Sequence, residues 1–154
     1  MAAAKFHGRV ECARLLGELL ARHLAGDGGD APACDLVVPV PLHPDRLGRR
    51  GYNQAAVIAA PAALAAGAAV DQHAGKRRVN TPPQSGLAGS DRCVNVRAAF
   101  AVRRDLEELD VAIVDDVITT GHTVSALAVA LRRAGARRVE AWCAARVVSA
   151  QPPR

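Results

Sequence analysis

Aromatic side chains are scarce in this sequence. They make up 3% of its 154 residues, with one Trp, one Tyr and two Phe. A surface that binds single-stranded nucleic acid by stacking needs exposed rings at several positions, so the composition argues against such a platform. Hydrophobic residues nevertheless reach 50%, and the core must therefore be built mainly from Ala, Val and Leu.

Signals for zinc binding, export and membrane insertion are also missing. The four cysteines stand singly, without the C-x-x-C pair of a zinc or redox motif. The N-terminus lacks the continuous apolar segment of a signal peptide, so we expect a cytoplasmic protein with reduced thiols. The longest uncharged apolar run, residues 55–70, is shorter than the roughly 20 residues that a membrane span needs. It predicts a buried helix, and no membrane partner is expected.

The length and the charge set further limits. A chain of 154 residues has the size of one domain, without room for a second core. The net charge is +5, and 18 of the 20 basic residues are Arg. Arginine favours bidentate recognition of phosphate or carboxylate, although a genome rich in G and C produces the same bias. The charge is compatible with a nucleic acid or an anionic metabolite and becomes informative only where arginines cluster.

Hydrophobic periodicity predicts alternating helices and strands. We predict helices over residues 9–24, from 51–54 through the Ala-rich run, and over 123–134, with strands over 36–40, 98–102, 111–114 and 139–147. The last strand, helix and strand form the unit of a parallel sheet with right-handed crossovers. Residues 41–50 are read as an irregular segment, and residues 75–91 have no period and contain adjacent prolines. We predict a flexible loop over 75–91.

The segment VAIVDDVITTGHT, Val111–Thr123, carries the clearest chemistry. An apolar strand leads Asp115 and Asp116 into a predicted polar turn, Asp115–Gly121, before a helix. Ligands of open α/β sheets bind at the carboxyl ends of strands, and a Gly-containing loop at a helix N-terminus binds phosphate. The carboxylates would repel that phosphate, so they suit sugar hydroxyls or Mg²⁺. The alternative is that a threonine caps the helix and the Asp pair is merely solvated.

This segment resembles the phosphoribosyl pyrophosphate (PRPP) binding motif of type I phosphoribosyltransferases. The resemblance implies an α/β, Rossmann-like fold with a mostly parallel sheet flanked by helices. It also implies that Asp115 and Asp116 hold the ribose hydroxyls and Mg²⁺, while the threonine loop wraps the 5-phosphate. The implied PRPP-binding residues are Asp115, Asp116, Val117, Thr119, Thr120, Gly121, His122 and Thr123. His122 stands at a variable position of the motif and is given no catalytic role.

Further segments are similar to the ComF family of competence-associated phosphoribosyltransferase-like proteins. They are KFHGR from Lys5, VPVPLHPDRLGRRGYNQA from Val38, TPPQ from Thr81, RCVNVRAAF from Arg92 and the PRPP motif, in the family order. The resemblance covers nearly the whole chain and implies one domain, 1–154, with a hood region at 1–34 and the PRPP unit at 111–134. Family members commonly carry a zinc-ribbon segment ahead of this domain, and this sequence holds none.

A second candidate site follows the first predicted strand. The resemblance places a pyrophosphate-gripping loop there, and basic residues come directly after a Pro-x-Pro turn. The implied pyrophosphate-binding residues are Val40, Pro41, Leu42, His43, Arg46 and Arg50, with Arg49 beside them. Guanidinium groups match phosphate oxygens, although a solvated basic loop explains the same residues. The nearby Asn53 and Gln54 are expected to cap the next helix or orient this loop, and Tyr52 to pack or to contact a base.

The third element is the predicted flexible loop. Type I enzymes close such a loop over PRPP and bring a basic residue to the leaving pyrophosphate. Lys76, Arg77 and Arg78 are the catalytic candidates, although an ordinary basic surface loop remains the alternative. The remaining family positions here are Thr81, Gln84, Arg92, Asn95 and Arg97, of which the last three are expected to brace the site.

Two functions fit these motifs. The first is a phosphoribosyltransferase, hence a glycosyltransferase of nucleotide metabolism, that binds PRPP with Mg²⁺ and transfers the phosphoribosyl group to an unidentified nitrogen acceptor. The second is a non-catalytic PRPP-sensing or DNA-uptake accessory protein, for which nucleic acid would be a partner. Type I relatives often pair, so a homo-oligomer is compatible with the resemblance, but no residue of the sequence marks an interface.

Overall fold

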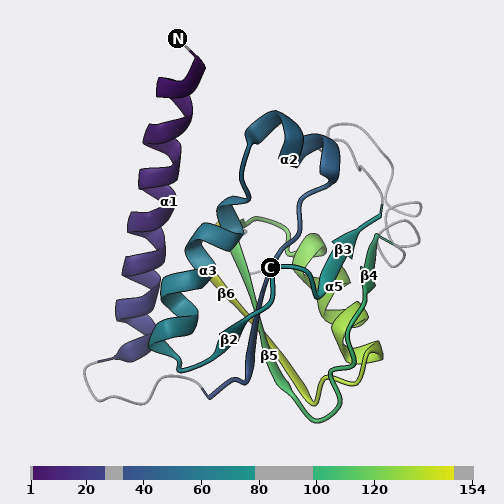
Figure 1. Cartoon of the computed structure of the whole chain (residues 1–154). Coiled ribbons are helices and arrows are strands. Elements are labelled where there is room, and N and C mark those ends of the chain that lie inside the picture. The colour runs from purple at the N-terminus through teal and green to yellow at the C-terminus, as the bar shows by residue number, and fades with distance from the viewer. Residues whose placement is uncertain (1, 27–32, 79–98, 148–154) are drawn as a thin grey trace, which may run out of the picture.

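The structure is a computed structural model that describes residues 2–26, 33–78 and 99–147. Figure 1 shows its helices and strands. The helices are α1 (Ala2–Ala25), α2 (Pro44–Arg50), α3 (Gln54–Ala65) and α5 (His122–Arg133). The strands are β1 (Leu36–Pro39), β2 (Ala69–Val70), β3 (Gly75–Arg77), β4 (Phe100–Val102), β5 (Asp110–Ile118) and β6 (Arg138–Arg146). None of the described helices has the length and apolar character needed to cross a membrane.

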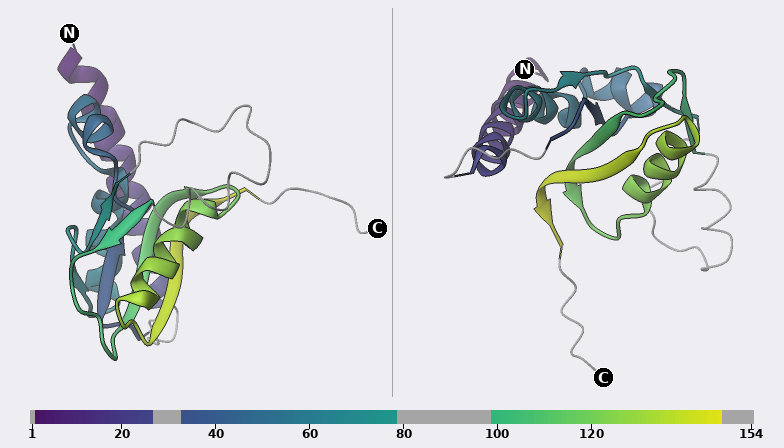
Figure 2. Two further views of the ribbon diagram at one scale, coloured as in Figure 1. Left: turned by 90° about the vertical axis from the view of Figure 1, so that its right-hand side faces the viewer. Right: turned by 90° about the horizontal axis from the view of Figure 1, so that it is seen from below.

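The main sheet is parallel and has the strand order β2-β1-β5-β6. Helices α1 and α3 cover one face, while α5 and the antiparallel hairpin β3–β4 lie over the other (Figures 1 and 2). The expected α/β fold with a parallel sheet flanked by helices is confirmed. Because all four strands run in one direction, their carboxyl ends meet at one edge of the sheet.

Strand β5 is the centre of the core. Val111 and Ile113 pack toward α5, whereas Ala112 and Val114 pack toward α1 and α3. All four are at most 1% exposed. This continuous apolar run is typical of a parallel strand that is covered on both faces, because successive side chains point to opposite sides.

Helix α1 lies directly against α3 because a glycine faces it. A Cβ atom added at Gly17 would lie 2.6 Å from Cγ of Pro61 and 3.0 Å from the carbonyl oxygen of Ile58. The position therefore accepts no larger side chain without a shift of one helix. Pro61 lies inside α3, where its ring supplies part of this contact.

Most predicted elements occur, with corrections at their ends. Helix α2 lies in the segment 41–50 that was predicted to be irregular, and it begins at Pro44 because proline is preorganised for the first helical turn. The Ala-rich run is not one helix, since α3 ends at Ala65 and the edge strand β2 follows. Strand β3 occupies the start of the predicted flexible loop, and the remainder of that loop lies almost wholly outside the described residues.

The largest correction concerns the PRPP motif. Asp115–Gly121 was predicted to be a polar turn, but β5 continues through Ile118. Beyond the end of β1, the strand remains paired with β6, with Asp115 opposite Cys143 and Val117 opposite Ala145. The two carboxylates therefore belong to the last part of a strand, where the sheet itself holds their backbone.

Candidate functional site

Two of the predicted site segments meet at the carboxyl edge of the sheet. The last paired residues of β1 and β5 are Pro39 and Val114, and the N–H of Val40 donates to the carbonyl of Val114 over 2.8 Å. The predicted pyrophosphate segment therefore starts beside Asp115. Neighbouring strands bring together residues that are about 75 positions apart in the sequence.

Asp115 and Asp116 both use one carboxylate oxygen to bind backbone. Oδ1 of Asp115 accepts the N–H of Asp116 over 3.0 Å, and Oδ1 of Asp116 accepts the N–H of Val117 over 2.8 Å. The two carboxyl groups lie close together, because their side chains interact directly. Burial, together with the negative charge of Asp116, raises the pKa of Asp115 to about 6. This accumulation of negative charge suits a site for hydroxyl donors or a cation.

The loop after β5 leaves the start of α5 open. Gly121 has φ +74° and is the N-cap of α5, so a glycine is required there and neither threonine caps the helix. The capping alternative is therefore wrong. The N–H groups of the first helical turn have no intrahelical acceptors and can bind an anion. Thr120 Oγ1 lies 2.9 Å from His122 Nδ1, a contact that fixes both exposed side chains relative to each other.

Helix α2 orders the predicted pyrophosphate segment. Nδ1 of His43 accepts the N–H of Asp45 over 3.3 Å and caps the helix, which uses one ring nitrogen of this candidate. Arg46 is partly buried. Arg49 donates to the carbonyl of Asp45, and Arg50 donates to the side chain of Gln54. Val40, Pro41 and Leu42 form the turn between β1 and this helix, and Pro41 is buried.

Asn53 connects this segment to α3. Its Oδ1 accepts the N–H of Ala55 over 3.1 Å, and its Nδ2 donates to the carbonyl of Val40 over 3.0 Å. Both roles considered for Asn53, helix cap and loop support, are therefore present in one side chain.

The hairpin contributes Arg77. Its guanidinium lies 5.7 Å from the ring centroid of Phe100, within the range of a cation–π contact. Burial and the positive charge of Arg46 lower the pKa of Arg77, while the negative charge of Asp115 acts in the opposite direction. Arg77 therefore interacts electrostatically with both Arg46 and Asp115. The three residues come from the three segments that the sequence singled out.

The other two catalytic candidates lie differently. Lys76 is exposed and alternates with Arg77 on the strand, and the exposed Arg78 directly follows β3, where its N–H donates to Ala99. Of these three, Arg77 is the cation whose charge is shown to act on the Asp115 carboxylate. Thr81, Gln84, Arg92, Asn95 and Arg97 lie outside the described residues.

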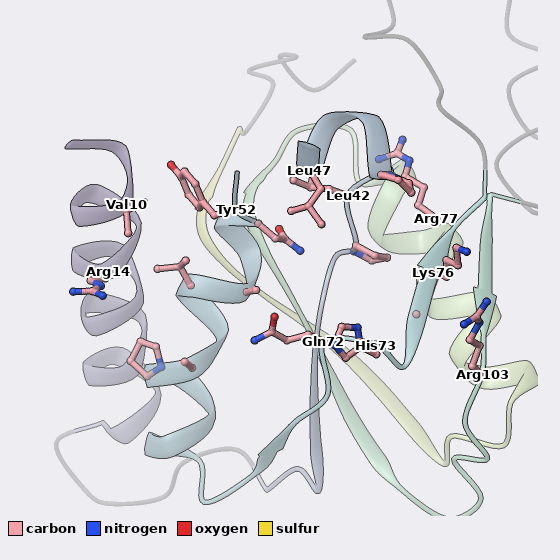
Figure 3. A pocket seen from close by; sticks show the side chains of 18 of the residues that line it. Val10, Arg14, Leu42, Leu47, Tyr52, Gln72, His73, Lys76, Arg77 and Arg103 are labelled. Atoms are coloured by element: carbon pink, nitrogen blue, oxygen red, sulfur yellow. The ribbon is translucent and has the colours of Figure 1, made fainter. Parts of the chain in front are cut away.

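A cleft of about 910 Å³ adjoins this site. It extends from α1 across α3 and the turn after β1 to the hairpin (Figure 3). Pro41, Leu42 and Arg77 belong to both the cleft and the candidate site. The cleft also contains residues that the sequence did not indicate. These residues are Val10, Arg14, Glu18, Gln72, His73 and Arg103.

The position of Arg103 was not readable from the sequence. Arg103 directly follows β4, which pairs with β3 across a long intervening segment, and the hydrophobic pattern alone does not give that register. Arg14 offered one signal, since it lies on the polar side of an amphipathic helix.

A divalent metal would have to be held by few protein groups. Within residues 2–26, 33–78 and 99–147, no cluster of three or more His, Cys, Asp or Glu side chains is placed to bind a metal. Asp115 and Asp116 nevertheless supply carboxylate oxygens, and Mg²⁺ is commonly bound through one or two carboxylates together with substrate phosphates and water. The donor set fits that mode of binding.

No family model matches the sequence, but curated relatives do. The DNA utilization protein YhgH of Salmonella typhi is 37% identical over 146 residues, which cover 94% of this chain and 64% of the relative. Competence protein F of Haemophilus influenzae is 36% identical over 115 residues, which cover 73% of this chain and 50% of that protein. These relatives support the assignment of the chain to the ComF family, which the sequence motifs predicted. The chain spans less than two thirds of the length of these relatives.

Solved structures show the fold of the chain. Glutamine PRPP amidotransferase of B. subtilis, in a complex with ADP and GMP, superposes with a TM-score of 0.56 and 24% identity. The match covers 86% of this chain and 26% of that enzyme. An allosteric regulatory enzyme of purine biosynthesis gives a TM-score of 0.53 over 86% of this chain and 25% of its own. The fold is that of type I phosphoribosyltransferases, as the sequence predicted.

Proposed function

We propose that this chain binds PRPP with Mg²⁺ at the carboxyl ends of β1 and β5 and transfers its phosphoribosyl group to a nitrogen acceptor. The observation that carries the proposal is that the predicted pyrophosphate segment starts beside the two aspartates of the PRPP motif, where the N–H of Val40 donates to the carbonyl of Val114 over 2.8 Å. The charge of Asp115 also acts on Arg77 of the hairpin, the segment assigned to the leaving group.

Each segment receives a defined role. The N–H groups at the start of α5, with the hydroxyls of Thr119–Thr123, bind the 5-phosphate of PRPP. Asp115 and Asp116 accept hydrogen bonds from the ribose hydroxyls. Their free oxygens would also hold Mg²⁺, which supplies positive charge to the diphosphate when it is bound.

The transfer exchanges one bond for another. The lone pair of the acceptor nitrogen forms a bond to C1 of the ribose while the C1–O bond to pyrophosphate breaks, and that electron pair leaves on the pyrophosphate. The proton of the attacking nitrogen passes to solvent. Arg46 and Arg77 neutralise the departing diphosphate, so catalysis comes mainly from positioning and electrostatic stabilisation.

The first experiment is a PRPP titration followed by thermal unfolding. A ligand present at 100 times its dissociation constant stabilises a protein by about 2.7 kcal/mol, which raises Tm by about 5–10 °C for a domain of this size. We expect this rise with PRPP and Mg²⁺ together, and a much smaller rise with either alone. The absence of any rise at millimolar PRPP would contradict the proposal.

Two variants locate the site. Asp116→Asn removes a carboxylate at the site end of β5 and is expected to abolish the PRPP-dependent rise. Asp110→Asn makes the same change at the other end of the strand, where Asp110 binds Arg137 over 2.9 Å. Each variant is compared with its own ligand-free Tm. An equal loss of the rise in both would show that the effect is not local to the proposed site.

The names of the relatives favour a second candidate, a PRPP-sensing or DNA-uptake accessory protein without transferase activity. Under this candidate PRPP binds but no acceptor releases pyrophosphate, and the chain binds DNA with an affinity that falls steeply as salt rises. Measurement of pyrophosphate release and of DNA binding at 50 and 200 mM salt separates the two functions.

A further inference from the structure

The cleft beside the candidate site has a basic end at the hairpin, where Lys76, Arg77 and Arg103 line it. Among the described lining residues the one carboxylate is that of Glu18, which lies with Arg14 on α1 at the other end. A neutral ligand would leave this excess of positive charge uncompensated. The composition of the wall therefore favours an anionic ligand.

Lys76 and Arg103 form the cation pair of this end. Lys76 is paired with Ala101 across the hairpin, and the N–H of Arg103 donates to the carbonyl of Ala74. Residues two apart on a strand share a face, so Lys76 and Arg103 are diagonal neighbours on one side of the hairpin, roughly 7–8 Å apart at the backbone. Within the part of the chain that the structure describes, neither has a carboxylate partner. One anionic group between them would relieve their mutual repulsion.

The end toward α1 has a different chemistry. Apart from Arg14 and Glu18, its lining is apolar and includes Val10, Val57 and Ala60. Tyr52 lies on this side, and Lys76 and Arg103 lie on the side of the hairpin (Figure 3). The two ends of the cleft therefore suit a ligand with an apolar body and one anionic end.

We propose that the cleft binds the acceptor, and that the acceptor is an amphipathic anion. Its apolar body would lie against α1 and α3, and its carboxylate or phosphate would lie between Lys76 and Arg103. The assignment as acceptor rests on the proposed function, whereas the binding of an amphipathic anion does not. A volume of about 910 Å³ and a long apolar wall exceed what a diphosphate alone would use.

A matched pair of fluorescent probes tests the anion. The probe 1-anilinonaphthalene-8-sulfonate carries one sulfonate on an apolar body, and N-phenyl-1-naphthylamine is the same body without it. We expect the sulfonate to bind with a dissociation constant at least tenfold lower. Equal or weaker binding of the sulfonate would overturn the proposal.

Two arginine variants place that binding in the cleft. Arg103→Gln is expected to reduce the preference for the sulfonate three- to tenfold. Arg104→Gln is the control, because Arg104 pairs with Asp71 at 3.3 Å and does not line the cleft. A preference that is unchanged in Arg103→Gln, or reduced equally in both variants, would show that the probe binds elsewhere and would overturn the proposal.

The experiments distinguish a failure of the proposed PRPP function from a failure of the proposed anion cleft. PRPP is titrated against each variant by the thermal shift described above, and Arg103→Gln should retain the PRPP-dependent rise. If that rise is absent in every variant while the sulfonate preference behaves as expected, the proposed function fails and the anion cleft stands. With saturating PRPP and Mg²⁺, the sulfonate should bind within twofold of its original affinity. Displacement by PRPP would mean that the cleft belongs to the PRPP site and would overturn the assignment as acceptor site.

Discussion

Strand β5 carries an aspartate near each end, and we expect the two carboxyl groups to change stability with opposite signs. Burial raises the pKa of Asp115 to about 6. At the other end, a hydrogen bond from Arg137 lowers the pKa of Asp110 below its ordinary value. We therefore compare the same substitution at both positions, Asp115→Asn and Asp110→Asn.

The sign at Asp115 follows from proton binding. The pKa is raised from 3.8 in the unfolded chain to about 6 in the fold, so the folded state binds the proton more tightly and stability falls as pH rises through this range. At about 1.4 kcal/mol for each pKa unit, the ionised carboxylate costs on the order of 3 kcal/mol at neutral pH. An asparagine removes that cost and keeps the oxygen that accepts the Asp116 N–H. We expect Asp115→Asn to be more stable than the wild type at pH 7.5, by up to about 6–12 °C in Tm.

At Asp110 the sign is reversed. A lowered pKa contributes stability that is present above the unfolded pKa and is lost as pH falls through the folded value. Asp110→Asn is therefore expected to be less stable than the wild type at pH 7.5, with a smaller deficit in acid.

Thermal and urea unfolding of the ligand-free proteins at pH 7.5 and pH 4.5 measure both effects. At pH 4.5 the gain of Asp115→Asn should shrink to about one third, because the wild-type carboxyl is then almost wholly protonated in the fold, and the remaining cost is that of protonating a group that is still mostly ionised in the unfolded chain. A loss of stability in Asp115→Asn at pH 7.5, or a gain that does not depend on pH, would refute this reasoning.

Two further predictions concern the framework of the site. Gly17→Ala should lower stability by up to about 2 kcal/mol, because overpacking against Pro61 costs about 1–3 kcal/mol and exceeds the helix preference of alanine. Gly48→Ala in α2, where a Cβ meets nothing within 4 Å, is the matched control and should raise stability by about 0.5–1 kcal/mol; equal gains by urea unfolding would contradict the close contact. Asn53→Ala should cost about 1–3 kcal/mol by losing both the cap and the bond to Val40, whereas Asn53→Ser keeps a capping oxygen and should lose less. Equal losses would mean that the cap contributes nothing, and a serine variant as stable as the wild type would mean that the bond to Val40 contributes nothing.

The sequence predicted those parts of the fold whose signal is local. The apolar run Val111–Val114 indicated the central strand, because a strand covered on both faces shows no alternation. The strand nevertheless continues four residues further, through Asp115 and Asp116. Pairing with β6 holds this polar extension, and local hydrophobicity contains no trace of such a partner. The short helix α2 was readable in principle, since Pro44 at its start and Gly51 with φ +78° after its end are ordinary helix boundaries.

The sequence predicted which segments form the candidate site, but it did not predict the contacts between them. Family motifs singled out the regions of Arg46, Arg77 and Asp115, whereas their proximity follows from strand order and from the hairpin. The basic end of the cleft was missed because Arg103 becomes a neighbour of Lys76 only through long-range pairing. Sequence spacing does not fix such a register.

The different anchoring of the two ligand regions has a consequence for how the molecule opens. Strand β5 lies between two strands and is buried on both faces, so its amides should be among the last to exchange with solvent. The hairpin consists of two strands of three residues in a separate sheet, an arrangement that is marginal on its own. Local opening of the hairpin would release the cleft ligand while β5 keeps its carboxylates in place. The carboxylates that would bind the ribose thus lie in the most stable part of the fold. The cations that would bind the cleft ligand lie in the hairpin, which can open without unfolding the rest of the chain.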